Sequence, residues 1–116
     1  MNAYDFRRIA MSMPGAVEAS HVGHPDFRVD GTVFATIGWP DGSWAMVKLT
    51  RKQQALWVEA VPSVFVPVSG GWGQRGSTNV RLAAADETTI RSAVAMAWQN
   101  KAPKQLVNEQ NKCRTQ

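Results

Sequence analysis

The spacing of apolar residues changes twice along this chain, and this change limits its fold more than any other feature. Between residues 6 and 13, apolar side chains recur three and four positions apart, as on one face of a helix. Between residues 27 and 49 they alternate with polar side chains, as in strands, and helical spacing returns at residues 90–98. A chain of 116 residues in the order helix, strands, helix, strands, helix predicts a single α+β domain, with an antiparallel β-sheet flanked by helices.

Capping and helix-breaking residues set the ends of the three predicted helices. A residue that favours the N-cap position precedes each helix: Asn2, Thr50 and Asp86. A proline follows each helix: Pro14, Pro62 and Pro103. Thr50 also stands three residues before Gln53, which is the spacing of a capping box. The sequence therefore predicts an N-terminal helix, a short central helix and a long C-terminal helix.

The alternating region predicts a meander of three antiparallel strands. Its first two strands are residues 27–29 and 32–37, and Asp30-Gly31 between them is typical of a two-residue type I′ hairpin turn. Strict alternation in the second strand puts Phe34 on the face opposite Ala35. Asp41-Gly42 then marks the turn into a third strand at residues 43–49.

Two further strands are predicted after the central helix. Val64–Val68 contains Pro67, which cannot donate to a ladder, so we expect this strand at an edge of the sheet. Ser69–Gly76 is expected to be a glycine-rich turn around Trp72, and Thr78–Leu82 resumes the alternation. We expect the domain to cover residues 1–100, with residues 101–116 as a basic, polar C-terminal extension.

The net charge of +4 is unevenly distributed, since residues 101–116 supply three of these charges. A basic, solvated end needs no ligand, so the net charge alone does not indicate a partner. No apolar run reaches the roughly 20 residues needed to cross a bilayer, and residues 1–13 lack the pattern of a secretory signal. Cys113 is the single cysteine, which excludes a disulfide within one chain. We therefore expect a cytoplasmic protein with no membrane partner.

Sequence patterns that carry catalysis or bind cofactors are missing or out of context. Residues 71–76 match G-x-G-x-x-G, but strands are predicted on both sides, so no helix N-terminus would face a phosphate. We expect a protein that is not an enzyme, with no catalytic residue, no metal and no cofactor. One alternative stays open, a small-molecule or metal site near Glu18, His21 and His24, which as a metal site would need a further ligand.

Cations and tryptophans on neighbouring predicted elements indicate nucleic acid as the leading partner. Five tryptophans are many for this length, and aromatic rings beside cations are typical of surfaces that bind single strands. Phosphate contacts need basic side chains that gather on one face. The residues expected to gather in this way are Arg28, Lys48, Arg51, Lys52, Arg75 and Arg81, with Trp72 stacking beside them. We expect non-specific binding to the DNA backbone.

A protein-interaction or homodimerisation module without nucleic-acid affinity is the competing interpretation. The edge strand at Val64–Val68 or an exposed patch at Trp39 and Trp44 would then hold a protein partner or a second copy of the chain.

An ordered series of short motifs resembles one known family. The series comprises Pro14-Gly15, Glu18, His24-Pro25, Phe27-Arg28-Val29, Gly31, Phe34-Ala35, Lys48-Leu49, Gly71-Trp72, Trp98 and Ala102-Pro103-Lys104. Over about residues 3–108 the chain resembles the MmcQ/YjbR-like family. The resemblance implies a compact α+β domain, similar to the CyaY-like and secretion-chaperone-like folds, and the description "DNA-binding" that the family carries by structural analogy. It implies no catalytic residue, and the chain has Thr32 where the family pattern often has a lysine.

Overall fold

The computed structural model describes residues 1–21, 23–38 and 41–114, and over these the predicted α+β order is confirmed. The elements are α1 (Ala3–Met11), β1 (Val17–His21), β2 (His24–Val29), β3 (Thr32–Ile37), β4 (Trp44–Lys48), α2 (Arg51–Ala60), β5 (Phe65–Pro67), α3 (Gly71–Gln74), β6 (Ser77–Arg81), the short 3₁₀ helix η1 (Leu82–Ala84), α4 (Glu87–Lys101) and α5 (Lys104–Arg114). The strands form one antiparallel sheet in the order β1-β2-β3-β4-β6-β5.

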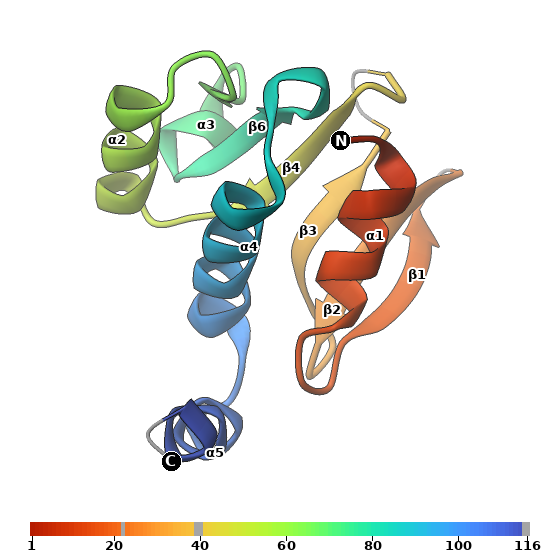
Figure 1. Ribbon diagram of the computed structural model, residues 1–116, viewed down its shortest axis with the longest axis vertical. Helices are drawn as coiled ribbons and strands as arrows, with labels where there is room; N and C mark the ends of the chain where they lie inside the picture. The colour runs from red at the N-terminus through yellow and green to blue at the C-terminus, as the bar shows by residue number, and fades with distance from the viewer. Residues whose placement is uncertain (22, 39–40, 115–116) are drawn as a thin grey trace.

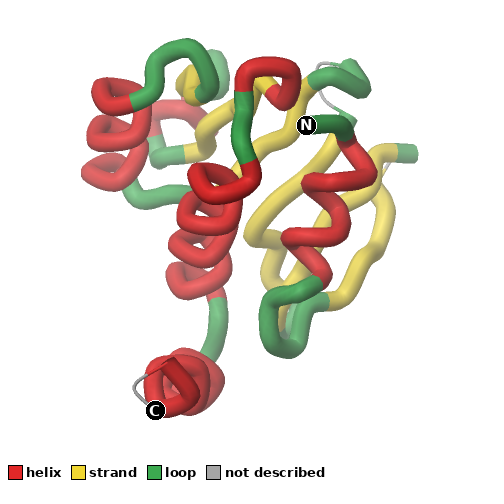
Figure 2. The backbone as a smooth tube through the Cα atoms, in the orientation of Figure 1, coloured by secondary structure: helices red, strands yellow, loops and turns green. Residues whose placement is uncertain are grey.

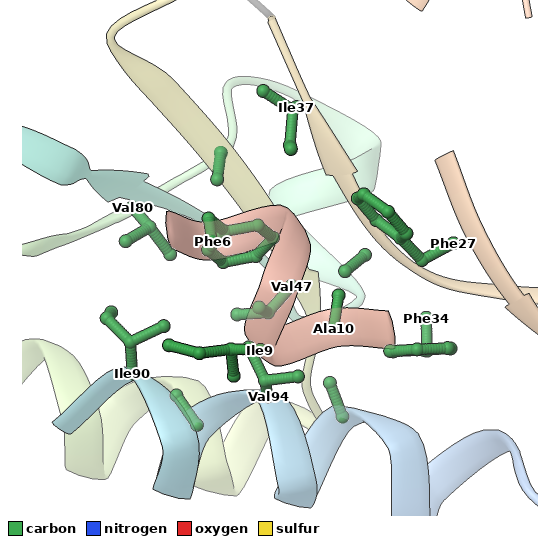
Figure 3. Close-up of a cluster of buried hydrophobic side chains, with 14 of the residues drawn as sticks. Phe6, Ile9, Ala10, Phe27, Phe34, Ile37, Val47, Val80, Ile90 and Val94 are labelled. Atoms are coloured by element: carbon green, nitrogen blue, oxygen red, sulfur yellow. The ribbon is translucent and has the colours of Figure 1, made fainter. Parts of the chain in front are cut away.

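Helices α1 and α4 lie against the same face of this sheet (Figures 1 and 2). The core lies between these two helices and the sheet. It includes Phe6 and Ile9 from α1, Ile90 and Val94 from α4, and Val47 from β4 (Figure 3). All five side chains are completely shielded from solvent. Burial of such side chains contributes about 1.5–3 kcal/mol each, which makes this helix–sheet layer the main source of stability.

The N-caps that the sequence predicts are present in α1, α2 and α4. The side chains of Asn2 and Thr50 each accept a bond from the backbone N–H three residues on, and both helices complete the reciprocal capping box. Asp86 accepts from the backbone N–H of Thr89 at 2.8 Å. These bonds satisfy N–H groups that the first turn of a helix otherwise leaves unpaired.

The predicted hairpin is confirmed, but the predicted alternation in β3 is wrong at Phe34. Asp30 and Gly31 both have positive φ, 51° and 77°, as a type I′ turn requires. Between Phe27 and Arg28 the partner in β3 jumps from Ala35 to Val33, so Phe34 is the extra residue of a β-bulge. The bulge lets Phe34 and Ala35 both reach the core, where each is fully buried.

Two further elements differ from the sequence-based expectation. Strand β1 was not predicted: Val17–His21 pairs with β2 and forms one edge of the sheet. The glycine-rich segment contains the one-turn helix α3 where only a turn was predicted. The expected edge strand is confirmed in shorter form as β5, Phe65–Pro67, and β6 ends at Arg81, one residue before the predicted end.

Helix α5 continues the chain beyond Pro103 and turns away from α4 (Figure 1). Its Leu106 and Val107 are half-buried and pack against the core residues. Leu106 also approaches Gly15, where a Cβ atom would lie 3.3 Å from its Cδ1. Within the described residues, no helix has both the length and the apolar character that a bilayer crossing demands.

Candidate functional site

The face of the sheet opposite α1 and α4, called here the outer face, carries the polar positions of β4 and β6. Ala45 and Val47 of β4 point to the core, so the side chains that alternate with them belong to the outer face. The ladder joins these positions to partners in β6 as the pairs Trp44–Arg81, Met46–Asn79 and Lys48–Ser77. Residues paired directly in this way share a face of the sheet.

Lys48, Trp72, Arg75 and Lys101 form a compact group, called here the Trp72 cluster. The Nζ atom of Lys48 lies 4.0 Å from the centroid of the Trp72 ring, and the Cζ atom of Arg75 lies 5.6 Å from it. Both distances are within the range of cation–π attraction. Trp72 is 59% exposed, so much of the ring still faces solvent.

Glycines with no room for a side chain bring α3 against the end of β4. A Cβ atom on Gly73 would lie 1.6 Å from the carbonyl oxygen of Val68, and one on Gly76 would lie 2.0 Å from that of Leu49. Gly76 also has a φ of 113°, which favours glycine. The glycines of the G-x-G-x-x-G string therefore permit close backbone packing.

Side-chain amides of α2 and α4 form hydrogen bonds at the junction of β4, α3 and β6. The Nε2 atom of Gln54 donates to the carbonyl oxygens of Gly73 and Ser77, both at 3.0 Å. The Nδ2 atom of Asn100 donates to the carbonyl oxygen of Lys48 at 3.1 Å and to Oε1 of Gln53 at 2.7 Å. These bonds fix the end of β4, the start of α2, α3 and the end of α4 relative to one another.

The cations of the Trp72 cluster are close enough to repel one another. The pKa of Lys48 is lowered, first by burial and then by the charges of Lys101 and Arg75. None of these three cations forms an ion pair with a residue that the structure describes. The cluster is therefore positively charged and available to an anion.

The exposed cations Arg51 and Lys52 extend this surface. They stand in the first turn of α2, directly after the β4–α2 junction that Asn100 holds. Neither residue forms an ion pair among the described residues. The acidic residue of the same helix, Glu59, stands eight positions beyond Arg51, about 12 Å along the axis.

Arg28 lies on the outer face at β2, and its charge is already paired. Its Nε and Nη2 atoms donate to the two carboxylate oxygens of Asp26 at 2.9 and 3.1 Å. Asp26 is only 4% exposed, and it raises the pKa of Arg28 through this bidentate bond. The structure therefore keeps Arg28 apart from the unpaired cations of the Trp72 cluster.

Arg81 stands at the other end of β6 from the Trp72 cluster. Its Cζ atom lies 5.0 Å from the centroid of the Trp44 ring, which makes a second pair of a tryptophan and a cation on the outer face. Trp44 is half-buried and Arg81 is exposed. The Nη1 atom of Arg81 also approaches the carbonyl oxygen of Ser63 at 3.5 Å.

The alternative site near Glu18, His21 and His24 has only part of its residues described. Glu18 accepts a hydrogen bond from Nε of Arg7, and His24 pairs with His21 across β1 and β2. The side chain of His21 lies outside the described residues, as does Trp39 of the predicted Trp39–Trp44 patch. Among described side chains, no three His, Cys, Asp or Glu residues are grouped as a metal would require.

Sequence reasoning missed two polar residues near the candidate site. Lys101 had been assigned to the C-terminal extension, but it approaches Lys48 because Asn100 bonds to the end of β4. Asn79, which the sequence analysis did not single out, lies on the outer face, and its Oδ1 atom is buried without a hydrogen-bond partner among the described residues. The available signal for Lys101 was its position at the end of α4, directly after Asn100.

The comparisons with known proteins identify a family and a fold. The model of the family described as YjbR matches residues 11–100. The crystal structure of the Deinococcus radiodurans protein DR2400, described as carrying the domain DUF419, superposes with a TM-score of 0.66 at 13% sequence identity. The superposition covers 84% of this chain and 75% of that one, and at this identity it shows the fold alone. No curated protein matches the chain.

Proposed function

The chain belongs to the YjbR family, and for this member we propose non-specific binding to the phosphate backbone of DNA, as a binding module and not as an enzyme. The contacts are made by the Trp72 cluster together with Arg51 and Lys52. A cytoplasmic location, which the single cysteine led us to expect, belongs to this proposal.

The observation that carries the proposal is the convergence of Lys48 and Arg75 on the exposed ring of Trp72, 4.0 and 5.6 Å from its centroid, beside the end of α4 that carries Lys101. The three cations come from β4, the end of α3 and the end of α4, and no described carboxylate pairs with them. Like charges held together cost free energy in the unbound protein. A phosphate group placed among them removes that cost and adds attraction, so the arrangement favours a polyanion.

Five of the nine acidic residues support the same proposal because they pair or bond away from the Trp72 cluster. Glu18 pairs with Arg7, Glu87 pairs with Arg8 and Arg91, and Asp26 pairs with Arg28. Asp5 and Asp86 accept bonds at the first turns of α1 and α4. Arg28, whose charge Asp26 neutralises, is expected to contribute less to binding than the unpaired cations.

Association through a sheet edge is the competing proposal, and one observation favours it. Strand β1 is an edge strand that contains neither lysine nor proline, and its Val17 is 59% exposed. Such an edge is a template for another strand. The predicted β5 edge is less suitable, because it has three residues and ends at Pro67. A mass that stays dimeric on dilution, with no DNA affinity, would favour this alternative.

Fluorescence anisotropy with a labelled 20-mer, single-stranded or duplex, tests DNA binding directly. We expect the logarithm of the association constant to fall with the logarithm of salt concentration with a slope of about −3.5 to −4.5, as for five phosphate contacts. The variant Lys48→Met/Arg75→Ala/Lys101→Ala should lose this affinity. The control Arg7→Ala/Arg8→Ala/Arg91→Ala removes the same charge from cations that already pair with Glu18 or Glu87, and it should retain most of the affinity. Absence of binding to both forms at low salt rejects the proposal.

A further inference from the structure

The outer face carries a continuous row of side chains between two tryptophan–cation pairs, called here the β4/β6 strip. It comprises Trp44, Met46, Lys48, Ser77, Asn79 and Arg81. At one end, Arg81 lies over Trp44, and at the other end Lys48 lies over Trp72. Positions 44 and 48 of β4 are separated by about 13 Å along the strand, so the two pairs can contact one extended ligand.

The middle of the strip holds an unsatisfied hydrogen-bond acceptor. The Oδ1 atom of Asn79 is shielded from solvent and has no partner among the described residues. Asn79 stands between Met46 on β4 and Val66 on β5, both half-buried. A buried acceptor without a partner costs stability, and a ligand N–H donor that displaces the half-buried side chains beside Asn79 and reaches Oδ1 recovers that loss.

The charge of the outer face suits an anionic ligand. Asp26 is the only carboxylate that the described strands place on this face, and Arg28 neutralises it with two hydrogen bonds. Arg81 and Lys48 at the ends of the strip have no ion pair among the described residues. Helices α1 and α4 cover the opposite face (Figure 1). On the strip itself Arg81 is exposed, Trp44, Met46 and Lys48 are half-buried, and Ser77 is only 4% exposed.

We propose that the β4/β6 strip binds single-stranded DNA, with one base stacked at Trp44 and another at Trp72. This inference rests on the proposed function and narrows it, because a duplex hides the faces of its bases inside the stack. Phosphates lie near Arg81 and Lys48, while Oδ1 of Asn79 accepts a hydrogen bond from the N–H group of a base between them. Aromatic rings beside cations hold single strands with little sequence preference, which fits a strip with one specific acceptor.

The first test compares a labelled 12-mer of mixed sequence with its own duplex at one salt concentration. We expect the single strand to bind at least tenfold more tightly. Trp44→Leu should weaken single-strand binding by about five- to a hundredfold, and Trp44→Phe should restore part of it. Tyr4→Ala is the matched control, because Tyr4 is a 70% exposed aromatic residue on α1, away from the strip, and its loss should change nothing.

A second variant separates binding from folding. Asn79→Leu removes the unsatisfied acceptor, so single-strand affinity should fall about three- to tenfold while the urea midpoint of unfolding stays level or rises. A residue with a purely structural role would lower the midpoint and leave the affinity of the folded protein unchanged. Met46→Glu, which puts a negative charge in the middle of the strip, should also abolish single-strand binding.

Photocrosslinking of the wild-type protein to a single strand that contains bromodeoxyuridine locates the bases without any change to the protein. We expect crosslinked peptides that contain Trp44 or Trp72. If the duplex binds as tightly as the single strand, and Trp44→Leu has no effect while Lys48→Met/Arg75→Ala/Lys101→Ala removes binding, this inference is wrong and the proposed backbone contact stands. If neither form binds the wild-type protein, the proposed function itself is rejected.

Discussion

Gly73 and Gly76 determine where the exposed ring of Trp72 lies, although neither residue contacts a ligand in our proposals. Backbone oxygens of Val68 and Leu49 occupy the space that their Cβ atoms would need. Any larger residue must push α3 away from β5 or from the end of β4. The position of Trp72 over Lys48 therefore depends on close packing of main chain against main chain.

Replacement of Gly73 by alanine should strongly destabilise the protein. The new Cβ would lie 1.6 Å from the Val68 oxygen, so the backbone must move, and we expect a loss of more than about 2 kcal/mol in urea unfolding. Gly42→Ala is the control, because nothing lies within 4 Å of its Cβ position and its φ is not in the left-handed region; it should change stability by less than about 0.5 kcal/mol. Equal effects at both positions would contradict the close approach.

Lys48→Met tests the charge of the Trp72 cluster through pH. The pKa of Lys48 is lowered in the folded protein, so its charge costs stability at pH values below that folded pKa. The cost disappears as the pH rises towards 10.5, the ordinary value for lysine. Wild-type stability relative to Lys48→Met should therefore rise between pH 7 and pH 10.5, as measured by urea unfolding. A decrease over this interval would mean that cation–π attraction outweighs burial and repulsion.

The same Lys48→Met variant has a separate consequence for binding. Loss of one phosphate contact should make the salt dependence of single-strand affinity less steep by about 0.7 in the logarithmic slope. An unchanged slope, measured by anisotropy, would show that Lys48 does not contact the DNA backbone.

At the scale of elements, local sequence signals predicted those helix ends and turns whose structure depends only on neighbouring residues. Caps and the Asp30-Gly31 turn predicted the helix starts and the hairpin because their hydrogen bonds and φ angles depend on neighbouring residues. Strand β1 was missed because Val17–His21 has few β-branched residues and forms only as the partner of β2. The bulge at Phe34 was missed because alternation alone assumes an unbroken ladder.

The sequence predicted that the candidate site would contain cations and a tryptophan, but it predicted only some of the residues that belong to it. Lys48, Trp72 and Arg75 were expected on neighbouring elements, and the two cations lie 4.0 and 5.6 Å from the centroid of the Trp72 ring. The pairing of Arg28 with Asp26 was missed because the predicted strand began at Phe27, whereas β2 also includes Asp26, on the same face as Arg28. Lys101 lies near Lys48 because the neighbouring Asn100 donates a hydrogen bond to the carbonyl oxygen of Lys48. No local sequence pattern predicts this long-range bond.

The contact between α2 and α3 depends on Gln54, and its removal should disturb both helices. Gln54→Ala leaves the carbonyl oxygens of Gly73 and Ser77 without the amide that donates to them, which should cost about 1–2 kcal/mol. Urea unfolding measures this loss. Gln99→Ala, an exposed glutamine of α4, should have almost no effect. If the two variants behave alike, the Gln54 bonds do not stabilise the junction.

At the scale of the whole molecule, the paired and the unpaired cations occupy different regions. The ion pairs of Arg7 and Arg8 join α1 to β1 and α4, and Arg91 pairs within α4. The unpaired cations gather where β4, α2, α3 and the end of α4 meet. A net charge of +4 therefore understates the local field at that junction. Binding should depend on salt far more than on sequence.

Deletion of residues 104–116 tests whether α5 belongs to the folded domain or is the extension expected from the sequence. Leu106 and Val107 pack half-buried against the core, so we expect the deletion to cost about 1.5–3 kcal/mol in urea unfolding. Leu56→Ser is a control for loss of an exposed apolar residue, since Leu56 is 62% exposed. An unchanged midpoint after the deletion would support the boundary at residue 100.

The register around the bulge at Phe34 also decides which face of the sheet Thr32 occupies. Thr32 pairs with Val29, whose side chain points into the core, so position 32 projects on the helix side of the sheet. A lysine there would stand at the hairpin end, behind the strip that carries Lys48. We therefore expect Thr32→Lys to leave the affinity for a ligand on the outer face almost unchanged.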